Sequence, residues 1–516
     1  MIRFIIILFF IKIQHLFCFF PPIRPANLRT VPNITAFRAE RSSFFRHIAI
    51  YPGKGLSRVF FIAISVSIIY IKSCSFSVEN EARFTVETKT RYGKLLLAAL
   101  FILIASVVAG YLLLALSFAI PFREDPVRHE ETVAVLDEEG LYPRDKSSGR
   151  PLDNWADSYS VLIAAYDGDE NAFEKAAAAY HIQSGYNPYE WLSGHVDEVP
   201  EQMSYARYWH GYLLFLRPLM TFLNIRQIRN VNTVCLFAVI LAVLILMMQK
   251  LRKCVVPFLC TLLFLAPTAM GSCFEYSRIF YISLFMCALI LFDPGWLRKE
   301  TGLLMMFLAG GILTAYLDFL SAPLLTLSVP LTVYCVREEN SARLLRRVLL
   351  CCVFWAAGYA GMWAGKWIIA LLFQRRGFLY SLFYSIQERS STTVYNIKTS
   401  RIYAIRKNFA ELLVSKKTDL LPALYALFAA AGMILYRRRI TKRTIRTSAV
   451  LLFIAFFSVA WYFILANHSI VHFWLHAYRT GATSVFAVLC ALDAGNITTC
   501  PENCGATSAE DVLLKD

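Results

Sequence analysis

Long apolar segments recur along this chain and are separated by polar stretches of very different length. An apolar run of about 18 residues or more can cross the roughly 30 Å hydrocarbon core of a bilayer as an α-helix. The sequence therefore predicts an all-α polytopic membrane protein with about ten transmembrane helices. The predicted spans are Leu95–Ile120, Val231–Met248, Cys254–Met270, Ile279–Phe292, Gly302–Leu317, Leu320–Val336, Val348–Phe373, Leu420–Tyr436, Ala449–Leu465 and His472–Leu492.

The placement of Lys and Arg gives an independent test of this topology, because short cytoplasmic loops are enriched in basic residues. With ten spans and both ends cytoplasmic, the basic clusters between the spans all fall on the same side. These clusters are Arg91 and Lys94, Lys250–Lys253, Arg298 and Lys299, Arg343–Arg347, and Arg437–Arg446. The alternation predicts that the long loops 121–205 and 374–419 lie on the opposite, extracytoplasmic face.

Composition supports a lipid bilayer as the surroundings of this chain. It is 57% hydrophobic and 17% charged, whereas soluble domains carry about 25% charged residues. The net charge of +16 is explained by the cytoplasmic basic clusters, so we expect no nucleic-acid partner.

The first 90 residues form an N-terminal extension whose sequence differs in character from the rest of the chain. The opening MIRFIIILFFIKIQHLFCFF resembles a short signal or anchor segment, and no methionine occurs between Met1 and Met203. We interpret 1–90 as a signal or anchor, a poorly ordered extension, or an upstream in-frame translation with the true start shortly before Arg91. We expect no site there. The predicted regions that follow are a first span (91–120), an acidic loop (121–205), an interfacial helix (206–230), six spans (231–373), a basic loop (374–419), three spans (420–495) and a cytoplasmic tail (496–516).

The loop 121–205 concentrates the acidic residues of the chain. It holds eighteen Asp and Glu against six Lys and Arg, a local charge of −12. Within it the sequence predicts helices from Trp155 to Ala165 and from Glu170 to Tyr180. The first is capped by Asp153 or Asn154, and the second by Asp169 or Asn171.

Four carboxylates of this loop are candidate catalytic acids. Asp157 follows Asp153 by about one helical turn, so the two could form a base or metal site, although a capping role explains Asp153 as well. Glu124 and Asp125 directly follow the first span, where simple solvation at the membrane interface is the alternative.

Basic residues on the predicted outer face depart from the positive-inside pattern, which favours anion binding. Arg207, His210 and Arg217 lie on the predicted interfacial helix. Arg389 and Arg401 lie in the basic loop, where they could bind either lipid headgroups or a dedicated phosphate.

Polar residues also occur close to the predicted spans. Glu275 and Arg278 fit a simple ion pair, and Asp318 fits either solvation or the positioning of a partner. Lys366 lies inside an apolar run, which favours a cavity or a partner unless it extends toward the surface.

Three histidines recur at four-residue spacing in ANHSIVHFWLHAYRTG. His468, His472 and His476 would share one helical stripe, with Arg479 just beyond. Metal ligation, interfacial packing and an anion pocket are the alternatives. No carboxylate or cysteine lies nearby to complete a zinc site, so no metal or other cofactor is indicated.

Four short segments of the chain contribute to a family resemblance: LDNWADS, RYWHGYLLFLRPL, LDFLSAPLLTLSVPL and NHSIVHFWLHAYR. With a first span followed at once by a large acidic loop and then an interfacial helix, the chain over 91–493 resembles the GT-C superfamily of integral-membrane glycosyltransferases. It is most similar to bacterial multispan proteins of that type. It departs from the usual pattern because no DxD motif follows the first span.

This resemblance implies an inverting transfer of a sugar from a polyprenyl-phosphate donor to a cell-envelope glycan or glycolipid, on the outer face of the bacterial cytoplasmic membrane. Asp157 or Asp153 would be the base. Arg207, Arg389, Arg401 and Arg479, with His210, His468 and His472, would stabilise the departing phosphate. A lipid-linked glycan flippase or other transporter, and a non-enzymatic envelope-assembly protein, are the alternatives. A flippase would be expected to show internal repeats, and no clear repeat is present.

Overall fold

The computed structural model describes residues 82–121, 126–183, 199, 201–338, 341–373, 377–414, 427 and 442–494. The chain divides into two units, Met1–Ala98 and Ala99–Asp516. The described part of the first unit is the opening stretch of helix α4 (Ala82–Ala119), and the contacts discussed below lie within the second unit. The predicted all-α class is confirmed, since strands occur in the described residues only as two short hairpins.

In the described part of the chain, six helices are long and apolar enough to cross a membrane, which confirms the polytopic character of the chain. These spans are Tyr92–Ala119 within α4, Ile225–Lys250 (α10), Phe274–Phe292 (α13), Glu300–Leu317 (α14), Leu344–Phe373 (α16) and Lys442–Ile464 (α20). Helix α15 (Leu324–Arg337) is apolar but shorter, and α22 (Phe473–Ala494) has 22 residues. The predicted span Leu420–Tyr436 falls outside the described residues apart from Leu427, so a total of ten stays a prediction.

The predicted span Cys254–Met270 is divided between two helices. After the single turn η1 (Arg252–Cys254), α11 covers Val255–Leu265 and α12 covers Pro267–Gly271. The break comes at Ala266, whose φ of 55° is left-handed, a conformation that disfavours helix continuation. The following Pro267 occupies the first position of α12, which is where proline is tolerated in a helix.

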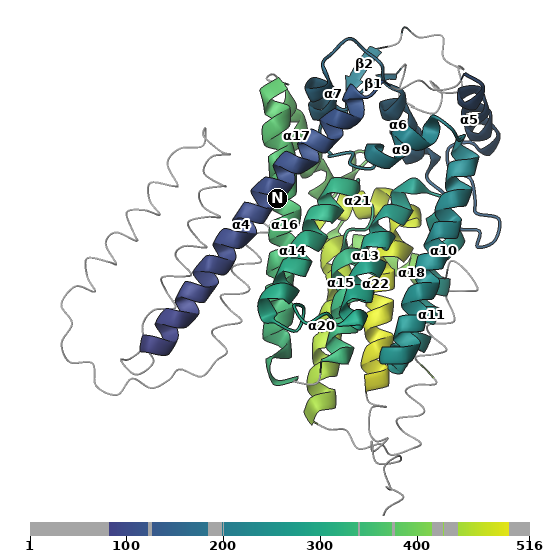
Figure 1. Ribbon diagram of the computed structural model, residues 1–516. Coiled ribbons are helices and arrows are strands. Elements are labelled where there is room, and N and C mark those ends of the chain that lie inside the picture. Colours follow the sequence, from purple (N-terminus) through teal and green to yellow (C-terminus); the bar gives the residue numbers. More distant parts are fainter. Residues whose placement is uncertain are drawn as a thin grey trace, which may run out of the picture. The chain divides into compact units, whose positions relative to one another are not determined.

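The spanning helices differ in how far they are enclosed by their neighbours. The apolar window of α13 is 72% buried inside the protein, whereas that of α10 is 22% buried. Helix α13 packs against α10, α14 and α15, and α15 in turn packs against α20 and α22. Helix α13 therefore lies in the centre of the packed helices, as Figure 1 shows, while α10 lies at their edge.

Helices α14 and α16 form the most extensive helix pair, and glycine sets their separation. A Cβ at Gly311 would lie 2.1 Å from the carbonyl oxygen of Trp355, and one at Gly358 would lie 2.2 Å from that of Leu308. Only residues without a side chain allow backbones to approach this closely, as in other small-residue helix interfaces of membrane proteins. This packing fixes the carboxyl end of α14, where Asp318 follows.

The segments outside the spans gather at two places in the sequence. The first contains α5 (Pro126–Glu139), α6 (Asn154–Ala165), α7 (Ala172–Ala178), the antiparallel strands β1 (Tyr180–Gln183) and β2 (Glu201–Ser204), and α9 (Leu213–Met220). The second contains α17 (Phe378–Ser390), the antiparallel strands β3 (Thr393–Val394) and β4 (Ile397–Lys398), α18 (Arg401–Val414) and α21 (Ala466–Val471). In Figure 1, α5, α6, α7, α9 and α17 lie at the same end of the spanning helices.

Both predicted loop helices are present, but α6 begins one residue before the predicted Trp155 and α7 begins two residues after the predicted Glu170. The side chain of Asp153 accepts a hydrogen bond from the N–H of Ala156 and caps α6, and that of Asn171 accepts from Glu174 and caps α7. The helix predicted for 206–230 is much shorter, because the chain forms a turn before Leu213 and Asn224 caps the separate helix α10. The side chains of Leu213, Leu216 and Met220 are buried, and α9 packs on α6.

Candidate functional site

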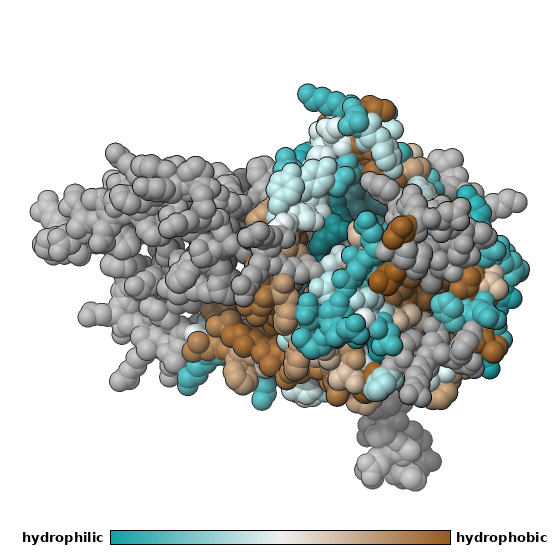
Figure 2. Space-filling model, turned by 90° about the horizontal axis from the view of Figure 1, so that it is seen from above, coloured by the Kyte–Doolittle hydropathy of each residue, from teal (hydrophilic) through white to brown (hydrophobic). Residues whose placement is uncertain are grey.

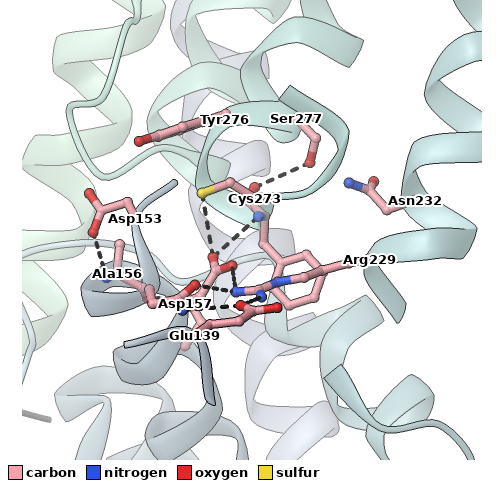
Figure 3. A network of polar contacts seen from close by, with 12 residues as sticks. Glu139, Asp153, Ala156, Asp157, Arg229, Asn232, Cys273, Tyr276 and Ser277 are labelled. Atoms are coloured by element: carbon pink, nitrogen blue, oxygen red, sulfur yellow. Dashed lines mark hydrogen bonds and ion pairs between the residues drawn. The ribbon is translucent and has the colours of Figure 1, made fainter. Parts of the chain in front are cut away.

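Asp157 forms a buried ion pair, which changes the role expected for it. Its Oδ2 lies 2.8 Å from Nη2 of Arg229 on α10, and its Oδ1 accepts a hydrogen bond from the N–H of Phe274. The same guanidinium donates to Glu139 and to the side-chain oxygen of Asn154, each at 2.7 Å (Figure 3). Both oxygens of Asp157 are therefore engaged in holding α6 against α10 and α13, which suits a positioning residue better than a base.

Asp153 lies at the start of the same helix but in a different environment. Its Oδ1 accepts from Ala156 at 3.0 Å, and in Figure 3 its carboxyl stands apart from the Asp157–Arg229 pair. Burial raises the pKa of Asp153 to about 6, against the opposing effects of the Ala156 N–H and the positive charge of Arg479. A carboxyl with a pKa near neutrality can both accept and release a proton at physiological pH.

Two further acids meet Asp153 in the protein interior. Glu275, in the first turn of α13, is close enough to Asp153 for the two carboxyls to share a proton. Glu275 also interacts electrostatically with Asp318, which follows α14. Burial raises the pKa of Asp318. Its Oδ1 accepts from the N–H and hydroxyl of Ser321 at 2.9 and 2.8 Å, while its Oδ2 is buried and has no hydrogen-bond partner in the described part of the chain.

Two arginines lie among these acids and keep N–H groups unpaired. Arg278 donates through Nε to the carbonyl of Phe274, and its guanidinium stacks 4.1 Å from the ring centre of Tyr212. Arg479, fully buried, donates through Nε to Leu475 and stacks 3.4 Å from the ring centre of Tyr276. Nη1 and Nη2 of Arg278 and Nη1 of Arg479 have no hydrogen-bond partner among the residues that the structure describes. We call Asp153, Glu275, Arg278, Asp318 and Arg479 the acid–arginine cluster.

The predicted convergence of the three histidines is present, although they do not share one helix. Helix α21 ends at Val471 and α22 begins at Phe473, yet the backbone N–H of His472 donates to His468 and that of His476 to His472. Their ring centres are 4.9 to 5.5 Å apart in all three pairs. The four-residue spacing is therefore kept across a break between two helices.

The hydrogen bonds of His468 define it as a neutral acceptor. One ring nitrogen donates to the carbonyl of Leu320, while Nε2 is buried without a partner. Burial and the neighbouring His472 lower the pKa of His468 well below its usual value, so Nε2 carries a lone pair rather than a proton. His476 is anchored similarly, since its Nδ1 donates to the carbonyl of Ser321.

A second group of cations lies beside the histidines. The guanidinium of Arg389, on α17, is 5.9 Å from the ring centre of Tyr208 and interacts with both His468 and His472. Arg207 lies 5.3 Å from the ring centre of Tyr205 and donates to the hydroxyl of Ser385. Neither arginine forms an ion pair within the described part of the chain. We call Arg207, Arg389, His468 and His472 the outer cluster.

Three of the residues predicted to bind phosphate have structural partners instead. Arg217 donates to the carbonyls of Ala164 and Ile120, and Arg401 donates to those of Phe463, Ile464 and Ser390. His210 donates through Nε2 to the carbonyl of Tyr205, and its Nδ1 is 3.1 Å from the hydroxyl of Tyr212. These side chains join segments of the fold and leave few groups for a ligand. The predicted candidates Glu124 and Asp125 lie outside the described residues.

The sequence indicated some residues of the acid–arginine cluster without predicting the cluster itself. Glu275 and Arg278 fitted a simple ion pair, but the described residues contain no ion pair between them, and Oε2 of Glu275 is unpartnered. Asp318 fitted a solvated acid, but it is 2% exposed. Charged residues at the ends of apolar helices were the available signal. Their convergence depends on how α13, α14 and α22 pack, which no local pattern encodes.

The end of the helices that carries these clusters is hollowed. Viewed onto that end, the surface has a hollow lined by hydrophilic residues (Figure 2). Among the described residues no group of three or more His, Cys, Asp or Glu side chains has a geometry that could hold a metal ion. The arrangement offers acid–base groups and anion-binding groups at the same end of the helices.

Comparisons with known proteins leave this geometry to be interpreted on its own. No protein-family model, no curated protein and no solved structure matches the chain.

Proposed function

We propose that this protein is a membrane glycosyltransferase that moves a sugar from a polyprenyl-phosphate donor to an acceptor hydroxyl of a cell-envelope glycan or glycolipid. The observation that carries the proposal is the adjacency of two chemically distinct clusters. Within the described residues, the two arginines of the outer cluster form no ion pair. The acid–arginine cluster has a buried carboxyl whose pKa is raised to about 6.

The outer cluster suits the phosphate of the donor. Arginine forks match phosphate oxygens in a bidentate manner. Tyr205 interacts with both Arg207 and Arg389, which places the two guanidinium groups around a common neighbour. As the bond between the sugar and the phosphate breaks, negative charge grows on the phosphate. Cations already in position stabilise that charge without reorganisation.

The acid–arginine cluster suits the deprotonation of the acceptor. In the proposed step, Asp153 takes the proton from the acceptor hydroxyl as the hydroxyl oxygen attacks the anomeric carbon. The bond from that carbon to the phosphate oxygen breaks, and the electron pair leaves with the phosphate. Attack opposite to the leaving group inverts the anomeric configuration. Asp157, paired with Arg229, holds the helix that begins at Asp153 and so acts as a positioning residue.

The membrane setting fits a donor with a long apolar tail. The clusters lie at one end of the spanning helices, near the start of α13 and of α22. Helix α17, which carries Arg389, exposes Tyr380, Phe383 and Tyr384, and exposed aromatic residues are typical of the membrane–water interface. A lipid phosphate in the outer cluster could therefore keep its tail in the bilayer. We place this end on the outer face of a bacterial cytoplasmic membrane, in agreement with the distribution of Lys and Arg.

Sugar transfer by the purified protein tests the proposal. The protein in lipid nanodiscs is supplied with a panel of polyprenyl-phosphate sugars and lipid or glycan acceptors, and labelled product is measured. We expect transfer from at least one donor by the wild type, and a loss of at least a hundredfold in Asp153→Asn. Asp169→Asn, which changes an exposed aspartate of the same loop, is the matched control and should keep full transfer. Equal transfer by both variants would remove Asp153 as the base.

A further inference from the structure

We infer that the acid–arginine cluster binds a polyhydroxylated sugar ring, through hydroxyl groups that each bridge a carboxylate and an arginine. This inference rests on the proposed function and adds to it a class of ligand for groups that the transfer step does not use. A single base is sufficient for the transfer. The cluster contains two further carboxylates and two arginines; Glu275, Asp318 and Arg479 are buried, and Arg278 is half-buried.

The unpaired atoms of the cluster specify which ligand chemistry fits. Four side chains of the cluster have unpaired polar atoms, and these include both hydrogen-bond donors and hydrogen-bond acceptors. Among the described residues, guanidinium N–H donors of Arg278 and Arg479 have no partner, and neither have the acceptors Oε2 of Glu275 and Oδ2 of Asp318. Glu275 interacts electrostatically with both arginines and with Asp318, so donors and acceptors occur together within one small region.

A hydroxyl group is the ligand group that can pair with donors and acceptors that lie close together. Each hydroxyl donates one hydrogen bond and can accept two, so a hydroxyl can donate to a carboxylate and accept from an arginine at once. The ionised phosphate of a diester has only acceptor oxygens. It would pair with the arginines but leave Glu275 and Asp318 unsatisfied and repelled, and an unsatisfied buried charge is costly. The cluster therefore differs in kind from the outer cluster, which has no carboxylate of its own.

The rigidity of these groups supports a built site rather than an incidental gathering of charges. The guanidinium of Arg278 is held by its Nε bond to Phe274 and lies against both Tyr212 and Phe319. That of Arg479 is held by Leu475 and Tyr276. Asp318 is held by two hydrogen bonds from Ser321. The remaining donors and acceptors are thus fixed in direction before a ligand arrives, which lowers the entropic cost of binding.

Ligand-observed NMR on the whole protein tests the inference. Saturation-transfer difference spectra are recorded for free glucose, galactose, mannose and N-acetylglucosamine with the protein in nanodiscs. We expect at least one of these sugars to receive saturation at its ring protons. We expect the signal to fall at least fivefold in Asp318→Asn, which preserves the size of the side chain and can still accept from Ser321. Asp169→Asn should leave the signal unchanged. No saturation of any sugar, or equal signals in the two variants, would overturn the inference.

A second measurement uses only the wild type and so does not depend on the folding of a variant. Inorganic phosphate is added to the complex with the sugar that gives the strongest signal. We expect phosphate to leave the signal in place, because it belongs in the outer cluster. Displacement of the sugar would identify the acid–arginine cluster as an anion site and refute the inference.

The two proposals fail in different ways. Sugar binding without transfer from any donor would keep the sugar subsite and remove the transferase. Transfer without sugar binding would keep the transferase and remove the sugar subsite. If transfer occurs, the pattern of inhibition by the free sugar identifies the source of the ring. Competition with the donor indicates the transferred sugar, and competition with the acceptor indicates the acceptor glycan. Both patterns support the subsite.

Discussion

Replacement of Arg229 by methionine should destabilise the protein strongly, because it leaves a buried carboxylate without its cation. Asp157 is fully buried and lies 2.8 Å from Arg229. The substitution also removes the hydrogen bonds to Glu139 and Asn154. Breaking a buried ion pair by removing one partner costs about 3–5 kcal/mol. We therefore expect Arg229→Met to lower the free energy of unfolding by that amount.

A matched control lies one turn earlier on the same helix. Arg226 pairs with Glu138 at 2.6 Å, but the two side chains are 53% and 72% exposed. Exposed pairs contribute about 0–1 kcal/mol, so Arg226→Met should have little effect. Both variants are compared by denaturant titration in mixed micelles. A loss in Arg229→Met no larger than that in Arg226→Met would refute the reasoning. The double variant Asp157→Leu/Arg229→Met should recover most of the loss, because it buries no unpaired charge.

Three further predictions follow from single side chains. Because burial raises the pKa of Asp153 from its usual 3.8 to about 6, its contribution to stability should be full below pH about 4 and lost as the pH rises through 6. The midpoint of thermal unfolding is measured against pH for the wild type and for Asp153→Asn. The same pH dependence in both proteins would contradict this prediction. Lys366→Met should cost about 1.5–3 kcal/mol, measured by denaturant titration, because Nζ donates at 2.8 Å to the carbonyls of both Ala176 and Ala177 at the end of α7. Arg389→Gln should raise the KM for the donor by roughly 10- to 100-fold, the equivalent of one charged hydrogen bond; an unchanged KM would remove Arg389 from the phosphate site.

The sequence predicts the helices of this protein better than it predicts their breaks. The span predicted to end at Leu317 ends there, because apolar periodicity gives way to the polar residue Asp318. Asp153 and Asn171 cap the two loop helices, each being one of the two candidates predicted for its helix, since the preference for such residues at helix starts is local. The break at Ala266 was missed although the following Pro267 marks it, since the residue before a proline is disfavoured in the helical conformation.

The candidate site could be predicted only where one short segment carries it. His468, His472 and His476 converge as their spacing predicts, because the backbone hydrogen bonds from His472 to His468 and from His476 to His472 keep the four-residue spacing across the break between α21 and α22. Asp157 was chosen as a base from its place beside Asp153, but its partner Arg229 is 72 residues away. Arg401 and Arg217 were assigned to phosphate, but backbone carbonyls of other segments take their donors. Long-range pairing decides these roles.

The pH dependence of sugar transfer tests the central claim of this account most directly. The measurement is the rate of transfer from a saturating polyprenyl-phosphate sugar by wild type and Asp153→Asn between pH 5 and pH 8. We expect the wild-type rate to fall as the pH drops through about 6, where Asp153 takes up a proton, and Asp153→Asn to be inactive throughout. A variant within about tenfold of wild type, or a wild type that transfers from no donor, would contradict the assignment of Asp153 as the base of a membrane glycosyltransferase.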